Sequence, residues 1–267
     1  MKNTLVADNR RIAYQLTGPS ESLPLVLLHG FCEDASVWDG FIPHLDGLRV
    51  VRIDLPGFGE SDLPTAPGIE IYADAVLAVL ESLSVKKCVL VGHSMGGYTA
   101  LAFAEKYPER LAGLGLFHSH PFEDTPEGIA NRRRGIEMLQ SGKRDLYVAQ
   151  LFPTLFTESF AKANPDLINA LIDNGKRQSP EGIVAALEGM IARKNHENML
   201  RTSTCPVQFL IGSEDAIAPP DRVLQAAVLP AIADVHVLPG VGHMGMLEAA
   251  EKTAGIVRRF WEFCAQR

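Results

Sequence analysis

Residues 88–97 read CVLVGHSMGG, and this stretch decides the fold. The first four residues, Cys88 to Val91, are apolar and predict a short strand that is buried on both faces. From Gly97 onward the chain is rich in small and apolar residues until Pro108, before which a helix is expected to end. The stretch therefore predicts a strand, a very tight turn and a helix.

Ser94 lies on the predicted turn. Gly92 and Gly96, two residues to either side, lack the side chains that would clash in so sharp a bend. This Gly-x-Ser-x-Gly arrangement is typical of a nucleophile elbow, which lifts a serine hydroxyl clear of the sheet and near the positive end of a helix. We therefore predict that Ser94 is a nucleophile.

The chain of 267 residues suits one large α/β domain, or one core with an insertion. A hydrophobic fraction of 46% and a charged fraction of 21% are those of an ordinary soluble globular protein. The net charge of −7 argues against a nucleic-acid partner, and the arginine triplet at 132–134 is too short to form a basic stripe. We expect a small-molecule substrate and leave the oligomeric state open.

Four cysteines without metal-ligand spacing favour reduced thiols in a cytoplasmic protein. The first ten residues contain no apolar run long enough for a signal peptide, and no segment approaches the length of a membrane span. The sequence thus predicts a cytoplasmic protein that does not enter the membrane, and we expect no cofactor.

Strand and helix patterns alternate through the first 120 residues, which predicts an α/β fold: a mostly parallel central sheet with helices on both faces. Short extended runs at 4–7 and 11–17 predict an antiparallel hairpin at the sheet edge, turning at Asp8 and Asn9. The other elements predicted here are strands at 25–28, 49–53, 88–91 and 111–117, and helices at 34–45 and 70–83.

Helical patterns dominate between residues 121 and 200, where no buried strand is evident. An all-helical insertion between two strands would cover the strand ends as a cap, because a structureless loop of this length is unusual in a compact domain. We predict a core of residues 1–120 and 201–267 and a helical cap of residues 121–200. The helices predicted in the cap are 126–139, 143–151, 165–174 and 180–192; beyond it, strands are predicted at 207–211 and 235–238, and helices at 221–228 and 247–264.

Four candidate functional residues lie where predicted strands end. His29, Asp54, Ser94 and His118 all lie at the carboxyl ends of predicted strands, where ligands bind in parallel sheets. His118 and His120 could also form a metal-binding pair, but no third ligand is apparent, so we predict no metal site.

A serine nucleophile needs a base, and the base needs a third group to orient it. His243 follows the last predicted strand at the same sheet edge and is our candidate base, whereas the side chain of His93 should point away from so tight a turn. Asp215, expected to be buried by residues 216–218, is the preferred acid, and Glu214 is the alternative. Met95 and Phe31 are the candidate backbone N–H donors to an oxyanion.

These residues resemble the α/β-hydrolase-fold superfamily, in its serine-nucleophile branch with a helical cap (esterase- or lactonase-like). The resemblance covers nearly the whole chain outside the cap. It rests on His29-Gly30-Phe31, residues 54–61 (DLPGFGES), residues 92–97 (GHSMGG), residues 212–215 (GSED) and Gly242-His243.

The resemblance implies a catalytic triad of Ser94, Asp215 and His243, with Phe31 and Met95 supplying the oxyanion hole. With serine at position 94, the chain resembles the carboxylesterases, lactonases, carbon–carbon bond hydrolases and haloperoxidases of this family. Its dehalogenases and epoxide hydrolases carry aspartate at that position. Our leading hypothesis is a serine hydrolase that cleaves a small carboxylic ester or lactone through an acyl-enzyme at Ser94.

Two alternatives keep the same triad: a carbon–carbon bond hydrolase, which would need a cationic or amide anchor for a dienoate-type acid, and a haloperoxidase-like enzyme. Another hypothesis is a ligand receptor on this scaffold that is not an enzyme. The candidate pocket residues are His29, Tyr98, His118, Phe122, Phe152, Phe156 and Met190.

Overall fold

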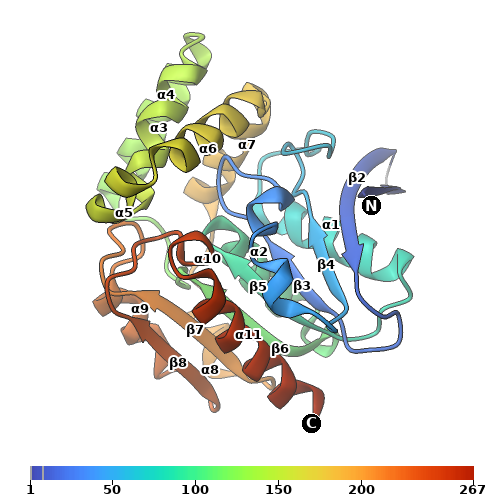
Figure 1. Cartoon of the computed structure of the whole chain (residues 1–267). Coiled ribbons are helices and arrows are strands. Elements are labelled where there is room, and N and C mark those ends of the chain that lie inside the picture. Colours follow the sequence, from blue (N-terminus) through green and yellow to red (C-terminus); the bar gives the residue numbers. More distant parts are fainter. Residues whose placement is uncertain (1, 8) are drawn as a thin grey trace.

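The computed structural model describes residues 2–7 and 9–267. Within this part of the chain, eight strands form one sheet (Figure 1). Its order is β1-β2-β4-β3-β5-β6-β7-β8, and only the β1–β2 and β2–β4 pairs are antiparallel. This confirms the predicted mostly parallel sheet with a hairpin at its edge; Asp8, in the predicted turn, lies outside the described residues. The strands are β1 (Lys2–Ala7), β2 (Arg10–Thr17), β3 (Leu25–Leu28), β4 (Val50–Ile53), β5 (Cys88–His93), β6 (Leu111–Phe117), β7 (Val207–Gly212) and β8 (Ala233–Leu238).

The central strands are short apolar runs that are buried along their whole length. β3, β4, β5 and β7 have no exposed residue, as expected of parallel strands covered on both faces. In register, Leu28 lies opposite Ile53 on one side and Gly92 on the other, and Gly92 lies opposite Leu116. The loops that follow β3, β4, β5 and β6 therefore begin at one edge of the sheet.

Helices cover both faces of the sheet. Figure 1 shows α11 crossing in front of the sheet, where it packs against β6 and η2, while α2 packs behind it against β5 and β6. The helices of the core are η1 (Ala35–Trp38), η2 (Ile42–Leu45), α1 (Ile69–Ser82), α2 (Met95–Lys106), η3 (Pro108–Arg110), α9 (Pro220–Ala227), α10 (Gly245–Glu248) and α11 (Ala250–Ala265).

The chain between β6 and β7 is helical, and in Figure 1 most of it stands above the sheet. α8 (Glu197–Arg201) differs from the other helices of this segment because it packs against α2 of the core. The cap boundary that we proposed at residue 200 lies inside this helix. α5, η4 and α8 had no counterpart among the predicted helices. The helices of this segment are α3 (Pro126–Gln140), α4 (Arg144–Leu151), η4 (Phe152–Leu155), α5 (Glu158–Ala163), α6 (Pro165–Arg177), α7 (Pro180–Ala192) and α8 (Glu197–Arg201).

Buried polar contacts fasten this helical segment to the core loops. Gln178, just after α6, accepts a hydrogen bond from the Gly59 backbone N–H (2.8 Å) and donates to the Asp34 carboxylate (3.2 Å). Asn174 donates to the same carboxylate oxygen (3.0 Å). Although burial opposes it, hydrogen bonds from Ser36 and Asn174 hold the pKa of Asp34 below its ordinary value. These contacts therefore fix the end of α6 against the loops that follow β3 and β4.

Two predicted helices differ from those observed. The predicted helix at 34–45 is two short 3-10 helices, because Pro43 has no N–H for a continuous helix and Phe41 N–H bonds three residues back, to Trp38. The predicted helix at 247–264 is broken at Ala249, whose φ of −148° separates α10 from α11.

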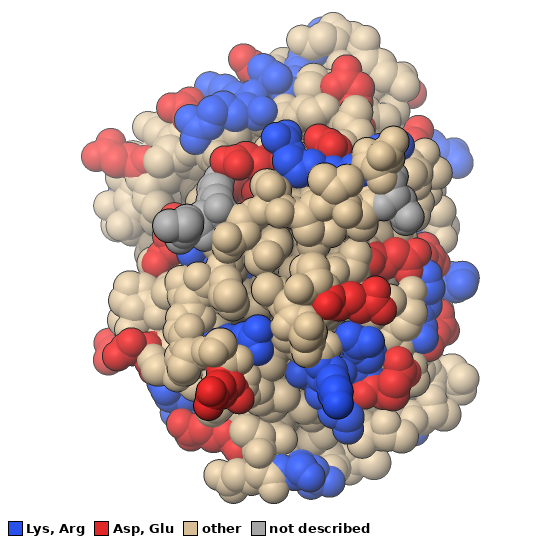
Figure 2. All heavy atoms as spheres, turned by 90° about the vertical axis from the view of Figure 1, so that its right-hand side faces the viewer, with Lys and Arg blue, Asp and Glu red and all other residues tan. Residues whose placement is uncertain are grey.

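The surface carries charge of both signs. On the face seen in Figure 2, acidic and basic side chains are interspersed, and neither kind forms a continuous patch. The four cysteines are free thiols. Within the described residues, no helix is both long and apolar enough to span a bilayer.

Candidate active site

Ser94 occupies the junction of β5 and α2 in a strained backbone conformation. Its φ is +50° and its ψ −112°, a region that a residue with a side chain rarely adopts and that costs about 1–3 kcal/mol. A Cβ on Gly96 would lie 2.6 Å from the carbonyl oxygens of Leu28 and His29, and one on Gly92 would collide with the Gly96 carbonyl. The glycines therefore permit the predicted sharp turn, and the serine is held on its outside.

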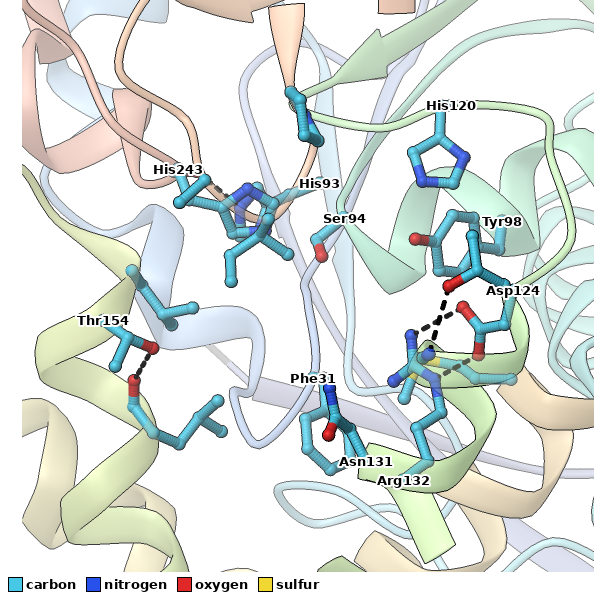
Figure 3. A pocket seen from close by; sticks show the side chains of 18 of the residues that line it. Phe31, His93, Ser94, Tyr98, His120, Asp124, Asn131, Arg132, Thr154 and His243 are labelled. Atoms are coloured by element: carbon cyan, nitrogen blue, oxygen red, sulfur yellow. Dashed lines mark hydrogen bonds and ion pairs between the residues drawn. The ribbon is translucent and has the colours of Figure 1, made fainter. Parts of the chain in front are cut away.

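Asp215 and His243 meet although 28 positions separate them in the sequence. His243 Nδ1 lies 2.8 Å from Asp215 Oδ2 and 3.0 Å from Oδ1, and both side chains are buried. Nε2 is thus the nitrogen left to face the cavity that Ser94 also lines, and Figure 3 shows the serine hydroxyl pointing into that space. No hydrogen bond joins Ser94 to the His243 ring in the described residues, which is common before a substrate binds. Glu214, the alternative acid, is exposed.

The Asp215 carboxylate receives more donors than His243 alone provides. The backbone N–H groups of Ile217 (2.9 Å) and Ala218 (2.8 Å) donate to Oδ1, and His118 Nδ1 donates to Oδ2 (3.1 Å). Burial opposes the charged carboxylate, but the charge of His243 and the hydrogen bonds from both histidines outweigh it and depress the pKa of Asp215 far below its ordinary value. Asp215 is therefore a fixed negative charge that orients His243.

His118 lies behind Asp215 and away from the cavity. It is 1% exposed, its φ is +50°, and its Nε2 has no partner among the described residues. A Cβ on Gly245 would collide with that nitrogen, so the ring fills a space that a glycine leaves open. Burial, outweighing the attraction of Asp215, lowers the pKa of His118 to about 4. A neutral His118 with its proton on Nδ1 therefore supports the carboxylate.

Acidification is expected to destabilise the fold through His118. The unfolded side chain binds a proton near its ordinary pKa of 6.5, whereas the folded one remains neutral until about pH 4. Between these values the unfolded chain binds more protons, so the free energy of unfolding falls as the pH falls, by at most about 3 kcal/mol from this residue. Urea titrations across this range should show that the free energy of unfolding depends less on pH in His118→Asn than in the wild type or in the exposed variant His44→Asn. An equal pH dependence in all three proteins would contradict the account.

The backbone N–H groups of Phe31 and Met95 donate no hydrogen bond within the described residues; Phe31 lines the same cavity as Ser94, and Met95 directly follows Ser94. His29 orients the first of them. Its Nε2 accepts from Leu55 N–H (2.9 Å), so its Nδ1 carries the proton and donates to the Gly30 carbonyl (2.8 Å). Since C=O and N–H of one peptide point in opposite directions, holding the Gly30 carbonyl directs the Phe31 N–H the other way.

The loop that carries His243 is fixed by contacts from two sides. Glu248 accepts hydrogen bonds from the N–H groups of Gly242 (3.1 Å) and Met244 (3.2 Å), and also from Thr157 in the helical segment (3.2 Å). The His243 N–H donates to the Leu155 carbonyl in η4 (2.9 Å). The position of the imidazole thus depends on the helical segment as well as on the sheet.

A cavity of about 740 Å³ lies between the strand ends and the helical segment. Ser94, His93 and His243 line it on the sheet side, and Figure 3 shows Tyr98, Asp124, Asn131 and Arg132 across from His243. Its other lining residues include Phe31, Glu33, His120, Tyr147, Leu151, Thr154, Leu155, Met190, Ala216, Ile217 and Arg222.

The cavity lining carries both arginines and carboxylates. Arg132 and Arg193 both form ion pairs with Asp124, so this group of three keeps one positive charge. Arg222 bonds only neutral groups in the described residues, namely the Glu123 carbonyl (2.8 Å) and the face of the Phe122 ring (5.2 Å to the centroid). Arg132 and Arg222 reach the cavity, whose lining also includes the carboxylates of Asp124 and Glu127. Arg222 is therefore a lining cation that bonds no carboxylate in the described residues.

Only two of the seven candidate pocket residues, Tyr98 and Met190, line the cavity. His29 lies under the Gly30 turn, and His118 lies behind Asp215. The three phenylalanines pack elsewhere: Phe122 beneath Arg222, Phe152 against Gly175, and Phe156 stacked on Phe160.

Sequence reasoning missed Glu33, Glu248 and the arginines of the cavity wall. Glu33 had a usable signal, because it lies four residues after His29 in the turn that was expected to hold the oxyanion. Arg132 belongs to the arginine triplet, whose other two members are exposed. His93 was expected to point away from the turn that carries Ser94. Its ring instead lies beside that of His243, with 4.9 Å between the ring centroids.

His118, Asp215 and His243 are also the described residues with spacing suited to a metal, their ligand atoms lying within 4.8 Å of one another. Both Nδ1 atoms already hydrogen-bond the carboxylate, at 2.8–3.1 Å. Hydrogen bonds therefore account for this group, and His120, which was considered with His118 as a metal-binding pair, is not part of it.

Comparison with known proteins agrees with this architecture. Residues 24–250 match the family description "alpha/beta hydrolase fold". A 2-hydroxy-6-oxononadienedioate/2-hydroxy-6-oxononatrienedioate hydrolase of Burkholderia vietnamiensis is 31% identical over 275 positions, covering 94% of this chain and 90% of the relative. A thermophilic esterase of Thermogutta terrifontis, solved with malate bound, has a TM-score of 0.92 and 33% identity over 99% of each chain.

An enol-lactonase of Burkholderia xenovorans has the same fold, with a TM-score of 0.90 at 22% identity over 97% of this chain and 99% of the other. The chain belongs to the alpha/beta hydrolase fold family. It is an enzyme of the hydrolase type that acts on a small molecule, and the resemblance inferred from its motifs is confirmed.

Proposed function

We propose that the protein is a serine hydrolase that cleaves a small carboxylic ester or lactone through an acyl-enzyme at Ser94. The observation that carries this proposal is the buried Asp215–His243 pair, which opens onto the same cavity as the strained Ser94 turn. A carboxylate, an imidazole and a hydroxyl in this order form a relay that activates the hydroxyl. The esterase relative at 33% identity supports the same reaction class.

The proposed reaction begins when Ser94 Oγ attacks the carbonyl carbon and His243 Nε2 takes its proton. Phe31 and Met95 N–H groups stabilise the resulting oxyanion, and Asp215 stabilises the imidazolium. The tetrahedral intermediate collapses, the C–O bond breaks, and His243 returns the proton to the leaving alcohol. Water then attacks the acyl-enzyme in the same way and releases the acid.

A second candidate keeps this machinery and cleaves a carbon–carbon bond. Arg222 favours it, because this lining arginine bonds no carboxylate in the described residues and a dienoate-type acid needs a positive anchor. The Burkholderia vietnamiensis relative is named for a dioic acid of this kind, and malate, bound in the Thermogutta terrifontis esterase, is also a dicarboxylate. Both candidates therefore share the proposal that the substrate carries a carboxylate.

The two candidates separate in one assay panel. An ester, a lactone and a vinylogous diketone are each offered with a free carboxylate and as the neutral analogue. We expect turnover of the carboxylate-bearing ester or lactone; preferential turnover of the diketone would support carbon–carbon hydrolysis instead.

In Arg222→Gln, the value of kcat/KM for the carboxylate-bearing substrate should fall about 10- to 100-fold, because a charge-assisted contact is worth about 1.5–3 kcal/mol. The neutral analogue should change less than about threefold, since it makes no such contact. Exposed Arg259→Gln on α11 is the matched control. Equal losses for both substrates would show that Arg222 acts on the fold and not on a carboxylate.

A further inference from the structure

Glu33 and His93 form a buried pair that the proposed mechanism does not use. Glu33 is 2% exposed and His93 1%, and His93 Nδ1 lies 3.2 Å from Glu33 Oε2. The same carboxylate oxygen accepts the Gly30 backbone N–H (2.8 Å), while His93 Nε2 lies 3.0 Å from the His243 carbonyl oxygen. The pair thus spans from the turn that carries Phe31 to the loop that carries His243.

The contacts determine how many protons His93 holds. Each ring nitrogen faces an oxygen: a carboxylate oxygen at Nδ1 and a backbone carbonyl at Nε2. A neutral imidazole has a single N–H, so one of its nitrogens would direct a lone pair at an oxygen. If Glu33 were instead protonated on Oε2 and donated to Nδ1, Gly30 N–H would face the hydroxyl oxygen of a carboxylic acid, a weaker acceptor than a carboxylate. With His93 as an imidazolium and Glu33 as a carboxylate, all three contacts are hydrogen bonds and each involves a charged group.

The surroundings agree with an ion pair. Burial opposes a charged Glu33, but the charge of His93 and the hydrogen bonds from His93 and Gly30 bring the pKa of Glu33 below its ordinary value. A buried charge is stable only when it is paired and hydrogen-bonded, as this one is. The other titratable groups around the pair are His29, Cys32, His118, Asp215 and His243.

The pair also packs directly against the oxyanion turn. A Cβ on Gly30 would lie 2.6 Å from His93 Nδ1 and 3.1 Å from Glu33 Oε2, so only glycine fits without displacing them. At the other end, the His243 carbonyl that His93 holds belongs to the residue whose side chain is the proposed base. A shift of the pair would therefore move the oxyanion donor and the base relative to each other.

We propose that Glu33 and His93 are a charged positioning pair that fixes the spacing between the Phe31 oxyanion donor and the His243 base. The inference rests on the proposed function of Ser94. It assigns neither residue a covalent step: the pair acts through the two loops that it joins. Misplacing a catalytic group by about 1 Å can lower the rate about 100-fold, so loss of this spacing should be measurable as a lower kcat.

The first test measures the protons directly. In protein labelled with ¹⁵N-histidine at neutral pH, the His93 ring should show two protonated nitrogens, with its signals assigned by their loss in His93→Phe. Glu33→Gln should remove one of them, because the amide cannot balance a second ring proton. Exposed Glu188→Gln on α7 should leave the His93 signals unchanged. A single protonated nitrogen in the wild type would overturn the proposal, and this readout does not depend on catalysis.

The second test measures catalysis in the same variants. Glu33→Gln should lower kcat for a chromogenic ester about 10- to 100-fold, with KM changing less than about threefold, because alignment and not binding is lost. Glu33→Asp, which keeps the charge, should recover part of the loss. An unchanged kcat in Glu33→Gln would overturn the positioning role. Phosphonate labelling of Ser94 in the wild type separates this failure from a failure of the proposed nucleophile.

Discussion

Replacing Ser94 by alanine is expected to lower kcat for a chromogenic short-chain ester by a factor of about 10⁴ or more. The substitution removes only the hydroxyl group. The strained turn at φ +50° should persist, because alanine keeps the Cβ and the turn depends on Gly92 and Gly96. What remains is the contribution of the oxyanion donors and of substrate binding, which is small beside nucleophilic catalysis.

The matched control for Ser94→Ala is Ser141→Ala, which removes an exposed hydroxyl that bonds only the Glu137 carbonyl. Circular dichroism and thermal unfolding of both variants establish that the fold is intact. Turnover by Ser94→Ala within tenfold of the wild type, with the control also active, would end the assignment of Ser94 as nucleophile.

Replacing Asp215 by asparagine should cost about 10⁴ in kcat, for a different reason. In the wild type, Oδ2 accepts from Nδ1 of both His243 (2.8 Å) and His118 (3.1 Å). An amide NH₂ in that position faces two N–H groups, so the histidines must move their protons to Nε2. His243 would then present N–H to Ser94 where a lone pair is needed. If the amide instead turns its oxygen toward the histidines, its NH₂ faces the N–H groups of Ile217 and Ala218.

The neighbouring carboxylate provides the control for Asp215→Asn. Glu214 is exposed, and Glu214→Gln should leave kcat within about twofold of the wild type, since exposed groups couple weakly to a buried site. Steady-state kinetics across the pH range measure both variants. A large loss in Glu214→Gln with little loss in Asp215→Asn would transfer the acid role to Glu214.

Much of the sheet could be predicted because its strands are apolar runs set between turn residues. β3 was predicted at its observed bounds, since Leu25 to Leu28 are buried on both faces and no polar residue extends the run. The order of Ser94, Asp215 and His243 along the chain was equally informative, because each follows a strand at one sheet edge. Because β7 and β8 are neighbouring parallel strands, the loops that carry Asp215 and His243 begin side by side.

The cavity lining could not be predicted, because apolar character does not say which face of a cap helix meets the cavity. Phe152 was as plausible a lining residue as Met190, yet it fills space left by Gly175 inside the helical segment. Arg132 on α3 and Arg222 on α9 are separated in the sequence by five α-helices and strand β7, and only the packed chain brings both to the cavity. Ile217, expected to bury Asp215, is 43% exposed, and backbone N–H groups support the carboxylate instead.

The loops that position the site also escaped sequence reasoning. Glu248 turns its carboxylate back onto the N–H groups of Gly242 and Met244, which fixes the loop that carries His243. Side-chain hydrogen bonds of this kind leave no periodic signal in the sequence. The same holds for His93, whose contact with the His243 carbonyl spans 150 positions.

The most direct test of the central claim is to treat the protein with a fluorophosphonate ester and identify the modified residue by peptide mass spectrometry. We expect one phosphonyl group per chain, on Ser94, formed together with loss of hydrolase activity and formed much more slowly in Asp215→Asn. Complete loss of activity with the adduct on another residue, or with Ser94 unmodified, would contradict the account.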